Sequence, residues 1–150
     1  MRNHTELLLL LMSIGILYTL PAVTSQSAGC YFTAMNLFGP PSIQEGQKFE
    51  VQTLFSVTCT GPGFYTVRAD LADSRTGQIL STSRMTYSVL GPFAAVITSS
   101  LQAPKAAGWW SLQMNLYVLT MTGVPIGPQS QQLFGLAITT SSPSTSKVSR

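Results

Sequence analysis

Residues able to carry out acid–base chemistry are few in this chain of 150 residues. The one histidine, His4, lies in an N-terminal segment that is predicted below to be a leader. Without it the rest of the chain lacks the commonest general base and the commonest transition-metal ligand. The acids beyond that segment are spread over turns and different strands: Glu45, Glu50, Asp70 and Asp73. The sequence therefore predicts a protein that is not an enzyme and uses no cofactor or metal.

Two arrangements of these acids could still do chemistry. A facing pair drawn from Glu50 and Asp70 could in principle hydrolyse a sugar linkage, since that reaction needs two carboxyl groups. Asp70 and Asp73 could offer oxygen ligands to calcium, although a calcium site usually gathers more ligands in one loop. No phosphate-binding loop, dinucleotide fingerprint or serine-hydrolase motif is present. Solvated charges on strand faces are the simpler interpretation of these acids.

Aromatic side chains are the remaining candidates for a binding site. From Trp110 to Val118 large apolar residues alternate with polar ones, which is the pattern of a strand with one buried face. The alternation sends Trp110 inward and sends Trp109 and Tyr117 outward. An exposed Trp could stack on a sugar ring or on a partner's side chain. Trp109 and Tyr117 are therefore the candidate binding residues, although capping of an open end of the sandwich is the favoured interpretation of Trp109.

The two cysteines predict a disulfide. Cys30 opens the first predicted strand and Cys59 follows the second, and in an antiparallel pair these two ends lie side by side. In the chain-entropy model a disulfide that closes a loop of about 30 residues stabilises the folded protein by roughly 3–4 kcal/mol. Two separate thiols are the alternative. A third possibility is a lipid on Cys30. Residues 27–30 resemble a bacterial-type lipobox, with Ser27 in place of the usual Leu, and a lipobox would make Cys30 a lipidated N-terminus.

The N-terminal segment predicts export. Residues 7–20 are an apolar run that would span about 21 Å as a helix, short of the ~30 Å hydrocarbon core of a membrane. Pro21 and small residues follow, so residues 1–27 are predicted to be a signal peptide cut after Ser25 or Ser27. An uncleaved anchor over residues 7–23 is the alternative. The expected location is extracellular or in the cell envelope, where disulfides persist.

Composition argues against nucleic-acid binding. The formal net charge is +3, only 9% of residues are charged, and the basic residues are scattered. The expected surface is low in charge and rich in the hydroxyl groups of Ser and Thr, with Gln and Gly beside them, which is typical of exported proteins.

Seven extended segments, with turn signals between them, account for the rest of the chain. They cover residues 31–38, 47–58, 65–71, 78–89, 93–101, 108–118 and 133–140. Residues 39–41 predict an edge or a kink, residues 42–47 a turn, and residues 78–89 an edge strand. We expect an all-β, two-sheet antiparallel β-sandwich with Greek-key connections over residues 30–140. The predicted leader helix precedes it, and a disordered Ser/Thr-rich tail follows over residues 141–150.

The order of these segments resembles small secreted prokaryotic-type immunoglobulin-like or fibronectin-III-like domains. Residues in three stretches carry the resemblance: Ile43, Gly46-Gln47, Phe49 and Val51; Phe93, Leu101 and Ala103-Pro104; and Gly108-Trp109-Trp110-Ser111-Leu112. The resemblance is topological and covers residues 30–140. True immunoglobulin domains bridge their two sheets with cysteines, whereas this pair would join neighbouring strands. The resemblance implies a fold and no particular activity.

The expected function is that of a non-enzymatic exported or cell-surface module that acts by binding or assembly. Its partners would be other surface proteins or glycans, and it would touch a membrane only through an uncleaved N-terminal segment. One alternative is a surface-filament subunit assembled by strand addition, with residues 25–30 or the tail as the donor. The other is a carbohydrate-binding module that uses Trp109 and Tyr117.

Overall fold

The computed structural model describes residues 29–140, which form strands and no helix. No helix able to span a membrane is therefore found among these residues. The predicted signal peptide and the predicted tail lie outside them. The strands are β1 (Cys30–Phe38), β2 (Ser42–Gln44), β3 (Lys48–Cys59), β4 (Gly63–Asp73), β5 (Ile79–Val89), β6 (Phe93–Gln102), β7 (Gly108–Leu119) and β8 (Ser130–Thr139).

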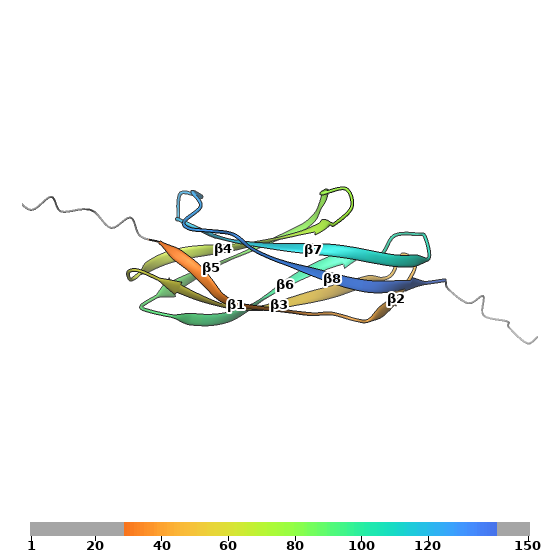
Figure 1. The fold of residues 1–150 in the computed structure, drawn as a ribbon, viewed down its shortest axis with the longest axis horizontal. Coiled ribbons are helices and arrows are strands. Elements are labelled where there is room, and N and C mark those ends of the chain that lie inside the picture. Colours follow the sequence, from red (N-terminus) through yellow and green to blue (C-terminus); the bar gives the residue numbers. More distant parts are fainter. Residues whose placement is uncertain (1–28, 141–150) are drawn as a thin grey trace, which may run out of the picture.

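The strands form two layered sheets (Figure 1). One has three strands in the order β1-β3-β6, and the other has five in the order β2-β8-β7-β4-β5. This is the strand order of an immunoglobulin-like sandwich in which β5 pairs with β4 and not with β6. The predicted all-β fold, the two layers and the edge position of β5 are confirmed.

The prediction of a plain turn over residues 42–47 is wrong. Ser42–Gln44 forms β2, which pairs with Ala137–Thr139 of β8 in parallel, so the sandwich is not wholly antiparallel. The reason lies in the preceding Gly39-Pro40-Pro41, where the chain leaves the three-stranded sheet and crosses to the other one. Proline has no N–H to donate to a sheet ladder, so a pair of prolines suits this crossing.

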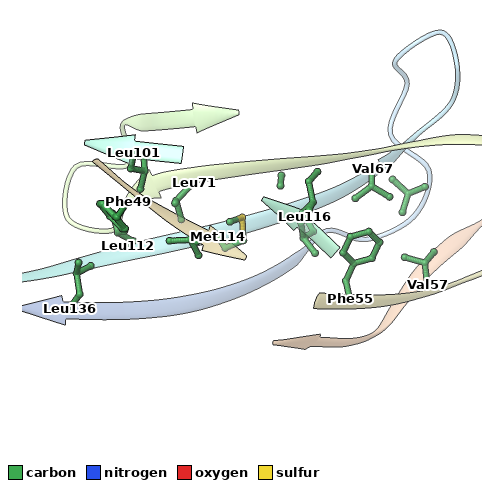
Figure 2. Packing of buried hydrophobic residues seen from close by; sticks show 14 of the residues in the cluster. Phe49, Phe55, Val57, Val67, Leu71, Leu101, Leu112, Met114, Leu116 and Leu136 are labelled. Carbon is green, nitrogen blue, oxygen red and sulfur yellow. The ribbon is translucent and has the colours of Figure 1, made fainter. Parts of the chain in front are cut away.

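The core lies between the sheets and follows the predicted alternation. β3 contributes Val51, Phe55 and Val57, and β7 contributes Leu112, Met114, Leu116 and Val118. Figure 2 shows Phe55 and Val57 of β3 and Leu112, Met114 and Leu116 of β7 among the packed side chains between the layers. Trp110 points inward as predicted: its indole is partly buried against the core and meets the Phe49 ring edge-on, with ring centroids 6.2 Å apart.

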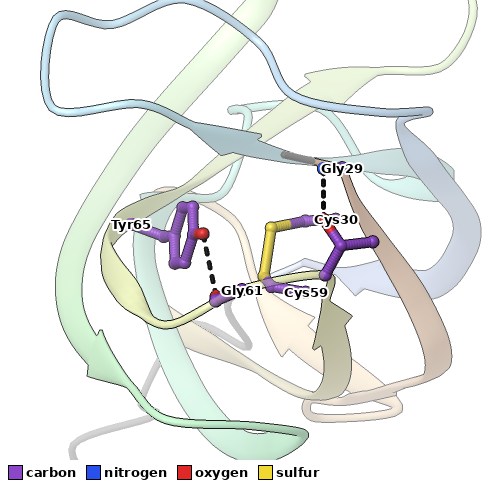
Figure 3. The surroundings of a disulfide bond; sticks show 6 residues. Gly29, Cys30, Cys59, Gly61 and Tyr65 are labelled. Atoms are coloured by element: carbon purple, nitrogen blue, oxygen red, sulfur yellow. Dashed lines mark hydrogen bonds between the residues drawn. A yellow bond between two sulfur atoms is a disulfide. The ribbon is translucent and has the colours of Figure 1, made fainter. Parts of the chain in front are cut away.

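The predicted disulfide is confirmed. Cys30 and Cys59 are directly opposite in the β1–β3 register, with Cα atoms 4.1 Å apart, and their bond joins neighbouring strands of one sheet. Just outside it, the Thr60 N–H donates to the Gly29 carbonyl. Figure 3 shows the bridge near Tyr65, whose hydroxyl donates to the Gly61 carbonyl at 3.0 Å. A lipid on Cys30 would need the same sulfur, so the lipobox alternative does not fit this structure.

Candidate functional site

The outer face of the five-stranded sheet carries both predicted binding residues. We use this name for the solvent side of the sheet, where the outward side chains of β7 lie among those of its neighbours. Trp109 is 64% exposed and Leu133 on β8 is 66% exposed. The indole of Trp109 covers Gly135 so closely that a side chain at Gly135 would overlap it. Trp109 therefore rests on the outer face and does not close an end of the sandwich.

Tyr117 lies on the same face but not at the same place. It is eight residues further along β7, about 26 Å at the usual rise of a strand. The guanidinium of Arg68, which is directly opposite in register on β4, lies 4.4 Å above the ring centroid of Tyr117. The two aromatics thus occur on one face as predicted, but they form no shared surface for one sugar ring.

The middle of the outer face is polar and closely packed. Asp70 is only 3% exposed, although the sequence suggested a solvated strand charge. That interpretation is wrong because Asp70 is on a central strand, where Thr82 and Asn115 stand directly opposite on either side. Its carboxylate lies 3.0 Å from Arg68 Nη2 and accepts a 2.9 Å hydrogen bond from the Thr82 hydroxyl. The Asp70 carboxylate is therefore already bound by protein groups.

Asp73 at the end of β4 lies on the opposite face of the strand, the one that carries Trp110. Its carboxylate accepts hydrogen bonds from Trp110 Nε1 at 2.9 Å and from the backbone N–H groups of Arg75 and Thr76 at 2.9 and 3.0 Å. These bonds, the Trp110 bond first, hold the pKa of Asp73 below its ordinary value because they stabilise the charged form. The side chain fixes both the turn after β4 and the indole of Trp110.

These positions leave no acid pair for the two chemical alternatives. Asp70 and Asp73 extend from opposite faces of β4, so they do not converge on a calcium ion. Glu50 points outward from the three-stranded sheet and Asp70 outward from the five-stranded one, so they cannot flank one sugar linkage. Among residues 29–140 there is no cluster of three or more His, Cys, Asp or Glu side chains that could hold a metal.

A groove on the side of the sandwich was not predicted. It has a volume of about 550 Å³ and lies between the free edge of β6 and the start of β5. Its walls are Lys48, Leu80, Ser100, Leu101, Gln102, Pro104 and Trp110. They come from four separate stretches of the chain, so only the pairing of strands across the two layers brings them together. The sequence signal was limited to the inward orientation of Trp110.

No protein-family model matches the sequence, and no curated protein is found as a relative. Solved structures share the fold. A glycosyl hydrolase family 2 member from Bacteroides cellulosilyticus is 13% identical with a TM-score of 0.60, over 71% of this chain and 15% of that one. A family 2 beta-glucuronidase is 11% identical with a TM-score of 0.55, over 75% of this chain and 12% of that one.

The C-terminal domain of wzt is similar in size as well as in fold. It is 15% identical with a TM-score of 0.51, over 76% of this chain and 75% of that domain. The chain spans about a seventh of the two hydrolases, so only a part of each is similar to it. At these identities the similarity shows a shared β-sandwich, and a shared sandwich does not carry an activity with it.

Proposed function

We propose that this protein is an exported, non-enzymatic β-sandwich module that acts by binding, and that Trp109 is at the centre of its binding surface. The observation that carries the proposal is the exposed indole held over Gly135. A large aromatic group fixed in place by the sheet presents contact area at low cost in conformational entropy. The disulfide supports export, because such bonds persist in oxidising compartments.

A glycan is the ligand class that suits this surface best. The indole offers an apolar plane for a sugar ring, and Leu133 extends it. Ser111 and Gln113 lie on the same face beside Gly135 and Leu133 in register, where their polar groups can reach sugar hydroxyls. The positions of the acidic side chains support a non-catalytic role. Asp70 and Asp73 lie on opposite faces of β4, and each is held by its own hydrogen bonds.

The test is binding to an array of cell-surface glycans by the protein and by Trp109→Ala. We expect a glycan to be retained by the protein and its affinity to fall at least about tenfold in the variant, which corresponds to about 1.4 kcal/mol. Trp109→Phe, which keeps an aromatic ring, should retain part of the affinity. Phe64→Ala is the matched control, because Phe64 is an exposed aromatic at the far end of the same face.

Unchanged melting temperatures of the variants would show that affinity alone was altered. Binding of no glycan by a folded protein would contradict the glycan proposal. Equal affinities of the protein and Trp109→Ala would contradict the placement of the site.

Filament assembly by strand addition is less well supported at the N-terminal side. Gly29 and Cys30 are already bound to Thr60 and Cys59 of the same molecule, by hydrogen bonds and by the disulfide. A donor formed by residues 25–30 would have to break these interactions. The C-terminal tail, the other suggested donor, lies outside the described residues.

A further inference from the structure

Among residues 29–140, no strand pairs with one edge of β6. β6 pairs with β3 along its other edge, where the Ala103 N–H just beyond its end donates to the Gln47 carbonyl. On the free side, the Thr98 carbonyl accepts a 2.9 Å hydrogen bond from the hydroxyl of Ser83 on β5. Alternate residues of a strand direct their backbone groups to opposite edges. Ser100 and Gln102 follow Thr98 at every second position of β6, so their N–H and C=O groups point to the same free edge and into the groove.

The inner wall of the groove is apolar and rigid. Leu80, Leu101, Pro104 and Trp110 form it. Trp110 cannot turn away, because its indole N–H is bound to Asp73 at 2.9 Å and its ring meets Phe49 edge-on. A side chain entering from the free edge of β6 would therefore meet a preformed apolar surface, which is the usual composition of a binding pocket.

The space beside β6 is one that related sandwiches fill with a strand. In constant-type immunoglobulin domains a fourth strand joins the three-stranded sheet at this edge. Here the corresponding segment, β5, pairs with β4 in the other sheet and approaches β6 at Ser83. Beyond that contact β5 and β6 are separated by the groove. The geometry of the sandwich therefore accommodates one more strand at Ser100 and Gln102.

Charge specifies what the added strand would carry. Lys48 is the charged residue in the groove wall and is directly opposite Gln102 in register. Glu50 is opposite Ser100 on the same outward side. Because the Lys48 side chain lines the groove, its positive charge favours an acidic side chain beside Gln102 on the added strand. Glu50 does not line the groove, and β6 lies between it and the added strand.

We propose that this groove binds an extended peptide segment of a partner protein, which adds to β6 as a fourth strand of that sheet. The segment runs antiparallel to β6, as every neighbouring pair in this sheet does. An acidic residue lies beside Lys48, and the apolar residue that follows it packs on Trp110 and Leu80. Main-chain hydrogen bonds supply affinity and the alternate side chains supply specificity. This site is separate from the surface around Trp109 and goes beyond the function proposed above.

The test is an NMR titration of the ¹⁵N-labelled protein with the capped peptide Thr-Thr-Glu-Leu-Thr-Thr. We expect shifts of the Ser100 and Gln102 amides and of the Trp110 indole N–H, with slower solvent exchange of the two amides. Replacing Glu by Lys in the peptide should weaken binding at least fivefold, and Lys48→Glu should reverse that preference. Arg84→Glu makes the same charge change on an exposed cation of β5 and should leave the preference unchanged.

Ser100→Pro is the decisive variant. It removes the N–H that points into the groove and leaves the bonds from β6 to β3 in place, because proline is tolerated at a strand edge. We expect peptide binding to be lost with the melting temperature nearly unchanged, while Trp109→Ala binds the peptide normally.

Three results would overturn the proposal. One is the absence of shifts at millimolar peptide, and another is undiminished binding by folded Ser100→Pro. The third is a matching set of Ser100, Gln102 and Trp110 shifts produced by a panel of simple sugars, which would make the groove a sugar site instead.

Discussion

Buried polar side chains are the most informative single residues of this sandwich. Asp70, Ser99, Asn115 and Thr53 are the buried polar or charged residues described. The first three have side-chain hydrogen-bond partners, whereas the hydroxyl of Thr53, which is 0% exposed, has none among residues 29–140. An unpaired buried hydroxyl costs free energy, because it exchanges its bonds with water for none in the protein. Thr53 is thus a site where the fold is less stable than it could be.

We therefore expect Thr53→Val to raise the free energy of unfolding by about 1 kcal/mol, because valine has the same shape without the hydroxyl. Urea unfolding measures this. The reverse change at a matched site, Val51→Thr, places a hydroxyl on the same buried face of β3 and should lower the free energy of unfolding by about 1–2 kcal/mol. A Thr53→Val protein less stable than the parent would show that the hydroxyl has a partner after all.

Asp73 makes stability depend on pH. Its pKa is lowered in the folded protein, chiefly by the Trp110 hydrogen bond, so its contribution is fully present above the ordinary value of 3.8. That contribution is lost as the pH falls through the lower folded value. We expect Asp73→Asn to be less stable than the parent at neutral pH and the difference to vanish in strong acid. Urea unfolding across this range measures it, and a difference independent of pH would contradict the assignment.

Trp110→Phe separates the effect of the Trp110 hydrogen bond on the pKa of Asp73 from the effect of the backbone hydrogen bonds. It removes the indole donor but keeps the backbone donors at Arg75 and Thr76. The pH dependence due to Asp73 should therefore be reduced without being abolished.

β1 is the element whose two ends are held by different means. Its first residue is joined to β3 by the disulfide, and its last leads into the crossing to the other sheet. The loop before β8 packs on the same first residue: Gly127, with φ of 85°, approaches the Cys30 carbonyl so closely that no Cβ fits. The start of β1 thus connects one edge of the three-stranded sheet to the loop that leads into β8.

Removal of the disulfide should measurably destabilise the fold. The cysteines are 29 residues apart, and we expect Cys30→Ala with Cys59→Ala to lower the free energy of unfolding by roughly 3–4 kcal/mol. Reduction of the parent by dithiothreitol should cause a similar loss, measured by thermal melting. The same reductant should leave the double variant unchanged, which serves as the control. Equal stability of parent and variant would mean that the bridge does not constrain the unfolded chain.

At the scale of the whole molecule, the sandwich is closed by pairing between distant parts of the chain. β2 joins the five-stranded sheet through residues 137–139 of β8, and Ile43 and Ile138 are buried together there. The last strand of the domain is therefore needed both for the core and for holding the crossover segment.

Truncation tests this closure. A chain ended after Thr140 should melt as the full chain does, because the sequence predicts a tail without structure beyond it. A chain ended after Leu136 loses Ile138 and every partner of β2, and should be less stable than Ile138→Ala, which loses about 2–5 kcal/mol through the side chain alone. If the chain ended after Leu136 were as stable as Ile138→Ala, the β2–β8 pairing would contribute nothing to the free energy of unfolding.

Short-range information explains which predictions succeeded. The alternation of apolar residues along β3 and β7 specifies which side chains face the core, and Gly and Pro mark where strands end. Antiparallel pairing of the first two long strands places Cys30 beside Cys59, so the disulfide could be predicted without knowing the second sheet. The inward orientation of Trp110 and the outward one of Trp109 followed from the same alternation.

The sequence by itself thus determined the seven longer strands, their buried faces and the disulfide, because each depends on residues close along the chain or on one antiparallel pair. Tertiary structure alone decided the parallel β2–β8 pair, the burial of Asp70 between Thr82 and Asn115, and the covering of Tyr117 by Arg68. It also assembled the groove beside β6. These features depend on which strands become neighbours, and packing of the whole sandwich decides that. Alternation along one strand specifies which of its faces is buried, but it carries no information about the strand beside it.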